Sequence, residues 1–112
     1  MINTSIGAPI NPELLQNYFH NLVNQFFKIL PMREEEEGSL YAYMNSLQAE
    51  LMGCAAFVRV VGTDPMFLSL LSILQYLIDN NPCEVCITKR EVFKAISLCN
   101  KLQSRYGGGA DF

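Results

Sequence analysis

Apolar residues between positions 40 and 61 recur at alternating spacings of four and three, and this regularity constrains the fold more than any other feature. The positions are Leu40, Met44, Leu47, Leu51, Cys54, Val58 and Val61. An α-helix places residues with this spacing along one side, whereas a strand turns every second side chain to the same face. Because the pattern lasts for only three heptads, it favours packing within a small bundle. We predict a helix over 39–61, with Gly53 admitting a neighbouring backbone and Gly62 ending the helix.

Two further segments begin with a capping residue followed by proline, which is a helical start signal. Asn11-Pro12 precedes a segment with a broad apolar face, and Pro31 predicts the end of that helix. Thr63-Asp64-Pro65 precedes a segment that ends at Asn80-Asn81-Pro82. The second of these helices is apolar on almost every side, so we expect it to be covered all round and to be the central element of the fold.

A fourth helix is predicted over 88–106. Thr88-Lys89-Arg90-Glu91 fits the capping box, in which a threonine and a glutamate satisfy the first amide groups of a helix reciprocally. The apolar positions that follow at helical spacing predict its buried face: Val92, Ile96, Cys99, Leu102 and Tyr106. No segment shows an alternation that would compete as a strand.

These four segments predict an all-α protein, a four-helix bundle with short loops that is oligomeric. The chain of 112 residues is one domain's worth, and its 50% hydrophobic content excludes disorder over most of its length. We expect a flexible N-terminal arm over 1–10, a single helical domain over 11–106 and a flexible glycine-rich tail over 107–112. The dense apolar stretch 66–78 is too short to cross a bilayer, so no membrane association is expected.

The first predicted helix carries more apolar surface than one neighbour can cover. It has two i, i+4 rows, one of Leu14, Tyr18, Leu22 and Phe26, the other of Leu15, Phe19, Val23 and Phe27. Aromatic residues are enriched at the centres of interfaces, so we expect another chain to cover part of this surface. The predicted interface residues are Tyr18, Phe19, Val23, Phe26 and Phe27.

The last predicted helix carries an unusual concentration of positive charge, although the chain as a whole has a net charge of −3. Five of its eight lysine and arginine residues lie between positions 89 and 105. Four of them share one helix face and form the basic stripe, the candidate polyanion-binding residues: Arg90, Lys94, Lys101 and Arg105. Such a stripe is either a solvated helix face or a surface for phosphates, since few base-reading side chains accompany it.

The chain lacks a recognisable catalytic or metal-binding set. Cys83 and Cys86 have the spacing of zinc ligands or of a redox pair, but no second ligand pair follows, so we interpret them as ordinary loop residues. His20 is the single histidine and has no serine or cysteine nucleophile in a recognisable motif. The acidic run 34–37 is interpreted as a solvated face. We predict no catalytic residues, no metal and no cofactor.

The sequence therefore favours a non-enzymatic interaction protein that acts through homo-oligomerisation or by docking onto a protein partner. In general character such a chain resembles accessory proteins of phages and mobile elements, a resemblance that assigns no role to any residue. The alternative is an accessory nucleic-acid-binding bundle that uses the basic stripe. With no signal-peptide pattern at the N-terminus, we expect reduced cysteines and a cytoplasmic location.

Overall fold

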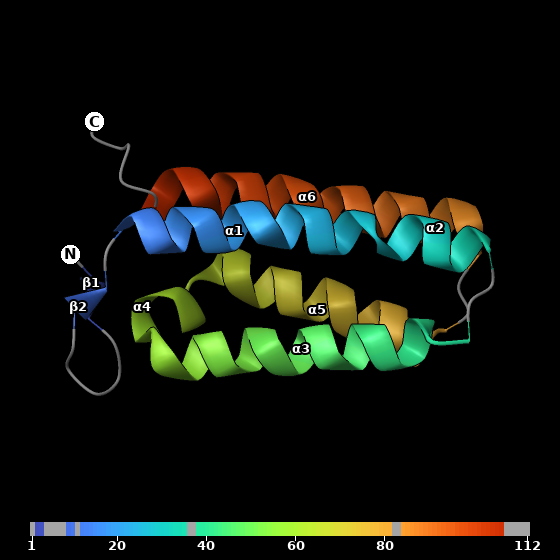
Figure 1. Ribbon diagram of the computed structural model, residues 1–112, viewed down its shortest axis with the longest axis horizontal. Helices are drawn as coiled ribbons and strands as arrows, with labels where there is room; N and C mark the ends of the chain where they lie inside the picture. Colours follow the sequence, from blue (N-terminus) through green and yellow to red (C-terminus); the bar gives the residue numbers. More distant parts are fainter. Residues whose placement is uncertain (1, 4–8, 11, 36–37, 82–83, 107–112) are drawn as a thin grey trace.

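The computed structural model describes residues 2–3, 9–10, 12–35, 38–81 and 84–106. Four long helices run along the molecule (Figure 1): α1 (Pro12–Phe27), α3 (Leu40–Phe57), α5 (Pro65–Asp79) and α6 (Val85–Tyr106). Two short helices, α2 (Ile29–Glu34) and α4 (Arg59–Gly62), follow α1 and α3. The prediction of an all-α fold built on four main helices is confirmed.

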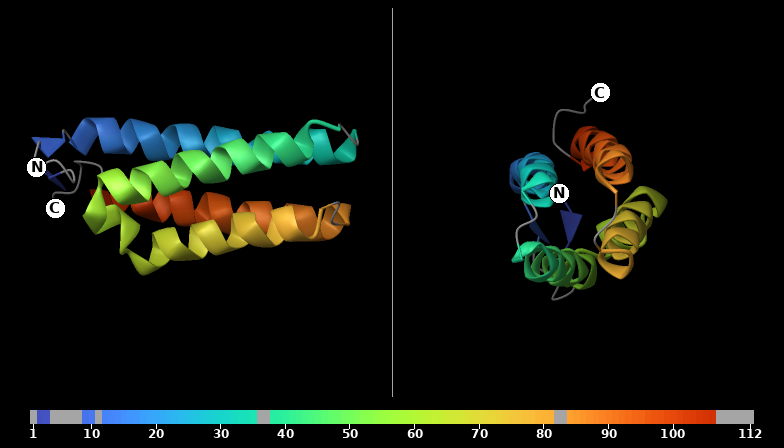
Figure 2. Two further views of the ribbon diagram at one scale, coloured as in Figure 1. Left: turned by 90° about the horizontal axis from the view of Figure 1, so that it is seen from below. Right: turned by 90° about the vertical axis from the view of Figure 1, so that its right-hand side faces the viewer.

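The four long helices lie at the corners of a bundle. Seen along the bundle axis in Figure 2, α1 neighbours α6, α6 neighbours α5, and α5 neighbours α3. The helix after α4 therefore does not lie at the centre. On α5, Leu68 is 48% exposed and Tyr76 is 41% exposed, so the expectation that this helix is covered all round is wrong.

A minimal strand pair precedes the helices, and no periodic pattern in the sequence indicates it. In β1 (Ile2–Asn3) and β2 (Pro9–Ile10), Ile2 pairs with Ile10 and Asn3 with Pro9 in antiparallel register. Strands of two residues are too short to show an alternating pattern, which is why the sequence predicted only an irregular arm here. The predicted tail 107–112 lies outside the described residues.

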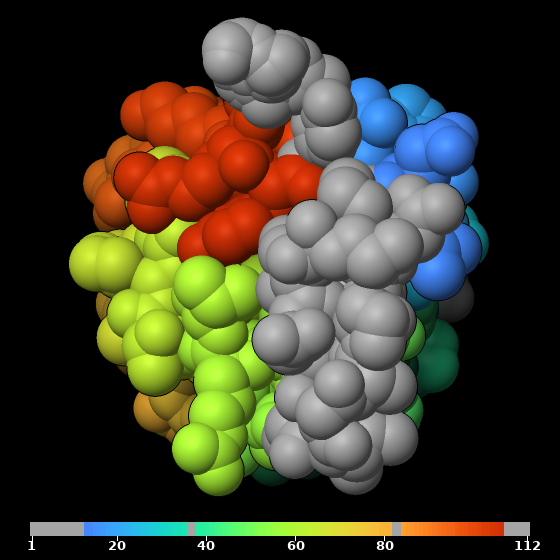
Figure 3. Space-filling view, turned by 90° about the vertical axis from the view of Figure 1, so that its left-hand side faces the viewer, coloured from blue at the N-terminus to red at the C-terminus, as the bar shows by residue number. Residues whose placement is uncertain are grey.

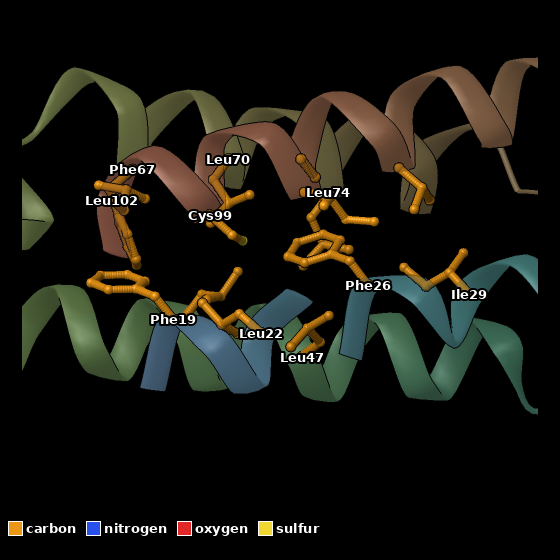
Figure 4. Close-up of a cluster of buried hydrophobic side chains, with 14 of the residues drawn as sticks. Phe19, Leu22, Phe26, Ile29, Leu47, Phe67, Leu70, Leu74, Cys99 and Leu102 are labelled. Carbon is orange, nitrogen blue, oxygen red and sulfur yellow. The ribbon is translucent and has the colours of Figure 1, made fainter. Parts of the chain in front are cut away.

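The core lies where all four long helices face one another. Figure 4 shows aromatic rings of α1 among aliphatic side chains of α3, α5 and α6. Its largest fully buried members include Phe19, Phe26, Phe67, Leu70, Leu74 and Leu102. The regular pattern over 40–61 faces inward as predicted, since six of its seven residues are buried and Cys54 is half-buried.

The first predicted helix is interrupted three residues before Pro31. Lys28 separates α1 from α2, and Pro31 lies in the first turn of α2. A proline has no amide hydrogen to donate to the carbonyl four residues earlier, which here is that of Phe27. In the first turn of a new helix the missing hydrogen costs nothing, because those amides have no helical partner. Pro31 therefore breaks the ladder at Phe27 without ending the helical path.

The predicted helix over 39–61 divides at Val58, whose backbone is extended. The short α4 then folds back so that Gly62 lies against α3. A Cβ atom at Gly62 would overlap the backbone carbonyl of Ala55. Gly53, by contrast, has no atom within 4 Å of where its Cβ would lie, so the prediction that another backbone approaches it is wrong.

Replacing Gly62 with alanine is expected to destabilise the fold by about 1–3 kcal/mol, the usual cost of forcing an extra methyl group into a packed site. The new Cβ would overlap a backbone atom, which cannot move aside as a side-chain end can. Chemical denaturation measures the loss. Gly53→Ala is the matched control, and it should stabilise the protein, because alanine is a better helix former than glycine. Equal stability of the two variants would contradict this packing.

The last helix begins three residues before the predicted capping box. Val85 is the first residue of α6, and the Thr88 hydroxyl donates a hydrogen bond of 3.0 Å to the carbonyl of Glu84. Glu91 does not reach back to Thr88 but pairs with Arg90 and Lys94. The prediction of Thr88 as an N-cap is therefore wrong, because this buried threonine bonds to the preceding turn from inside the helix.

Candidate functional site

The five predicted interface residues of α1 separate into buried and exposed members. Phe19 and Phe26 are fully buried in the chain's own core, so neither can meet a partner, and their assignment to an interface is corrected. Tyr18 and Val23 are half-buried, and Phe27 is 42% exposed. Association through these three residues stays a prediction.

Helix geometry explains this division. A step of four residues turns about 400° in an α-helix, so each i, i+4 row drifts by about 40° per step. In the row that starts at Leu14, the Leu14 side chain is 59% exposed and the Phe26 side chain is fully buried. The other row starts buried at Leu15 and ends exposed at Phe27. Each row therefore crosses from one environment to the other along α1.

A groove follows the seam between α1 and α3 near the start of α1. This α1/α3 groove has a volume of about 370 Å³, and its lining includes Leu14 and Tyr18 of α1 with Gly53 and Phe57 of α3. The described lining is apolar except for Glu50 and the polar atoms of Tyr18 and Cys54. Leu14 is 59% exposed and Phe57 is 43% exposed, so apolar side chains stand open to solvent on both walls.

The ionisable groups in and beneath this groove are not activated. Burial raises the pKa of Tyr18 well above its usual range, and Cys54 and Glu50 nearby raise it further. Burial also raises the pKa of the Cys54 thiol, and it raises the pKa of the Cys99 thiol to about 12. A thiol with a raised pKa is protonated at neutral pH and is a poor nucleophile. The α1/α3 groove is therefore suited to apolar contact.

A second exposed apolar feature joins α1 to α6. The rings of Phe27 and Phe93 meet edge to face with centroids 6.0 Å apart, and each ring is about half exposed. This pair lies towards the end of α1, away from Leu14. The sequence identified Phe27 as an interface residue but not Phe93, which lies beside the predicted buried positions of the last helix.

The basic stripe on α6 is exposed as predicted, but carboxylates lie among its members. The Glu91 carboxylate is 3.1 Å from Arg90 and 3.0 Å from Lys94. Burial alone would raise the pKa of Glu91, yet its bonds to Lys94 and Arg90 lower it below its ordinary value. Glu91 is therefore charged at neutral pH and offsets one of the two positive charges beside it.

Arg105, at the other end of the stripe, belongs to a cluster with Asp64. The Asp64 carboxylate accepts hydrogen bonds of 2.6 Å from Arg105, 2.6 Å from the Tyr106 hydroxyl and 2.8 Å from the Met66 amide. Tyr106 also lies 3.2 Å from the carbonyl of Val60. These contacts fasten the end of α6 to α4 and α5, and Figure 3 shows the end of α6 (red) against α4 (yellow-green).

Serines on α5 complete a surface that the sequence did not reveal as one. Ser69, Ser72 and Gln75 were recognisable as the polar stripe of an otherwise apolar helix. In the structure Ser69 and Ser72 face the seam with α6 and line a hollow together with Lys94, Ser97 and Lys101. Helix periodicity could identify each stripe, but only the packing of α5 on α6 brings the two together.

The remaining candidates do not assemble into a site. Cys86 is an exposed residue in the first turn of α6, and Cys83 lies outside the described residues. Within the ranges that the structure describes, no three histidine, cysteine or carboxylate side chains gather closely enough to hold a metal ion. Of the helices described, none has both the length and the apolar character needed to span a bilayer.

Comparisons with protein-family models, with curated proteins and with solved structures give no match, so the function is argued from the geometry of this chain.

Proposed function

We propose that this chain is a non-enzymatic interaction protein, and that it forms a homodimer through the α1/α3 groove. The observation that carries the proposal is the exposure of apolar side chains on both walls of an apolar hollow. Contiguous exposed apolar patches are a common feature of interfaces.

The shape of this surface favours a second copy as the partner. Leu14 stands out beside the groove, and above Gly53 there is open space where other residues would have a side chain. A surface that carries both a projecting side chain and a hollow can pair with its own copy about a twofold axis. Leu14 of each copy then enters the groove of the other.

Leu14→Glu is expected to weaken the dimer by at least about tenfold, equivalent to about 1.4 kcal/mol, because a charge would have to be buried in an apolar contact. Sedimentation equilibrium of the wild type and the variant measures the effect. The fold should be unchanged, since Leu14 is exposed in the single chain.

Met52→Glu is the matched control. Met52 is 58% exposed, nearly the same as Leu14, and lies on α3 but outside the groove lining. This variant should dimerise as the wild type does. Equal weakening by both variants, or a wild type that is monomeric at high micromolar concentration, would contradict the proposed interface. A monomeric wild type that binds a different protein through Leu14 would indicate that the groove docks onto a partner and does not mediate self-association.

A further inference from the structure

The outer seam between α5 and α6 contains two adjoining hollows, and both lie away from the α1/α3 groove. Their volumes are about 630 and 620 Å³, and they share Ser97 and Lys101 of α6. Figure 2 shows α5 and α6 side by side along this seam. We refer to the two hollows together as the α5/α6 groove, lined by Ser69, Ser72, Lys94, Ser97, Lys101 and Arg105 among others.

The polar groups of the α5/α6 groove suit an anion. Serines come from both walls, Ser69 and Ser72 from α5 and Ser97 from α6, and Lys94 and Lys101 line the same hollow. Among the residues that the structure describes, no aspartate or glutamate lines either hollow. Hydroxyl and ammonium groups donate hydrogen bonds to phosphate oxygens, and lysine adds a positive charge.

The carboxylates nearby determine how much positive charge remains for a ligand. Arg105 is committed to Asp64 at 2.6 Å, and Glu91 offsets one charge of the pair Arg90 and Lys94. Within the described residues, Lys101 has no carboxylate at ion-pair distance. Two positive charges therefore remain along the groove, rather than the four of the whole basic stripe.

The length of the groove favours a linear ligand. Lys94 and Lys101 are seven residues apart on α6, a separation of about 10.5 Å along the helix, and Arg105 lies about 6 Å further. We infer that the α5/α6 groove binds the phosphodiester backbone of single-stranded nucleic acid. Of the described residues that line the two hollows, none is aromatic, so they offer no ring on which a base could stack, and binding does not depend on sequence.

The salt dependence of binding separates this groove from the whole basic stripe. Short labelled oligo-dT and oligo-U strands are titrated at several salt concentrations. Two phosphate contacts predict a slope of about −1.4 for log K against log salt, which is about 25-fold weaker binding over a tenfold rise in salt. Four contacts would give a slope of about −2.8, about 600-fold over the same range, and would overturn the two-lysine groove.

Equal binding of both strands identifies the shared backbone as the ligand, and preference for one would show that its sugar or bases are read.

Ser72→Asp tests whether α5 takes part. Ser72 is exposed, so the fold should remain, but its new carboxylate would repel phosphate within the groove and weaken binding by at least about tenfold. Ser46→Asp, the same change at an exposed position of α3, is the control and should bind as the wild type does. Equal effects of these two variants would overturn the groove as the site.

Lys101→Gln should lower the salt slope by about 0.7, whereas Lys89→Gln, on α6 but outside both hollows, should leave it unchanged. Poly-glutamate serves as a carboxylate probe, and binding as tight as that of the oligonucleotides would contradict a phosphate site. The absence of binding at low salt would overturn the proposal outright. None of these outcomes depends on dimerisation, because the two grooves share no lining residue.

Discussion

Replacing Phe19 with alanine is expected to lower the free energy of unfolding by about 3–5 kcal/mol, the range for a buried phenylalanine. Phe19 has no exposed surface, and its ring lies 6.5 Å from that of Phe67 and 6.2 Å from that of Tyr106, measured between centroids. It thus joins α1 to both α5 and α6. Chemical denaturation with several probes of unfolding measures the loss.

Phe27→Ala is the matched control, since it removes the same atoms from the same helix. Phe27 is 42% exposed and its ring contacts that of Phe93, which is 50% exposed, so its loss should cost about 1.5 kcal/mol or less. Similar losses for the two variants would mean that both rings have the same environment, contrary to the arrangement of α1 found here.

Asp64→Ala is expected to cost about 2.5–4 kcal/mol. The Asp64 side chain caps α5 through the Met66 amide, a contribution of about 1 kcal/mol, and its charged hydrogen bond with Tyr106 adds about 1.5–3 kcal/mol. The matched control is Asp79→Ala. The Asp79 carboxylate is exposed and accepts a hydrogen bond from Gln75, so its loss should change the free energy of unfolding by about 0.5 kcal/mol or less. A neutral Asp64→Ala variant would show that the end of α6 is held by other contacts.

The ionisation of Asp64 should also make the free energy of unfolding depend on pH. Burial alone would raise the pKa of Asp64, but hydrogen bonds from Tyr106, Met66 and Arg105 outweigh it and lower the pKa below its ordinary value. A group whose pKa is lower in the folded protein stabilises the fold above its ordinary pKa and loses that contribution as pH falls through the folded value. Asp64→Asn, which keeps a capping oxygen, should therefore show a smaller loss of stability in acid than the wild type. An unchanged acid profile would contradict the role of Asp64.

Periodicity predicted which residues of this chain face inward, but it could not predict where helices break. The pattern from Leu40 to Val61 remains buried although the helix divides at Val58. Val58 carries no local signal for a break, and its extended backbone reflects the packing of Gly62 on Ala55. At Thr88 the local pattern was misleading, because a capping box requires its threonine to be the N-cap, and this residue lies inside the helix.

The candidate sites were predictable only in part, because they depend on how the helices pack against one another. The sequence identified the apolar excess of α1 but placed Phe19 and Phe26 at an interface, since the rotation of α1 in the bundle decides which end of each row meets the core. It also identified the basic stripe. Glu91, which offsets part of its charge, is a neighbour within the same helix, whereas the Asp64 carboxylate and the serines of α5 beside the stripe come from the tertiary arrangement.

Dimerisation through the α1/α3 groove is the central claim, and a comparison of Gly53→Arg with Gly53→Ala tests it most directly. Neither variant should harm the single chain, because the Cβ position is open and both residues are better helix formers than glycine by about 0.8–1 kcal/mol. An arginine would also fill the groove with a charged side chain, whereas alanine adds only a methyl group. By light scattering we expect Gly53→Ala to keep the wild-type mass of twice 12.6 kDa and Gly53→Arg to fall to 12.6 kDa with undiminished stability. A Gly53→Arg protein that stays dimeric would contradict this interface.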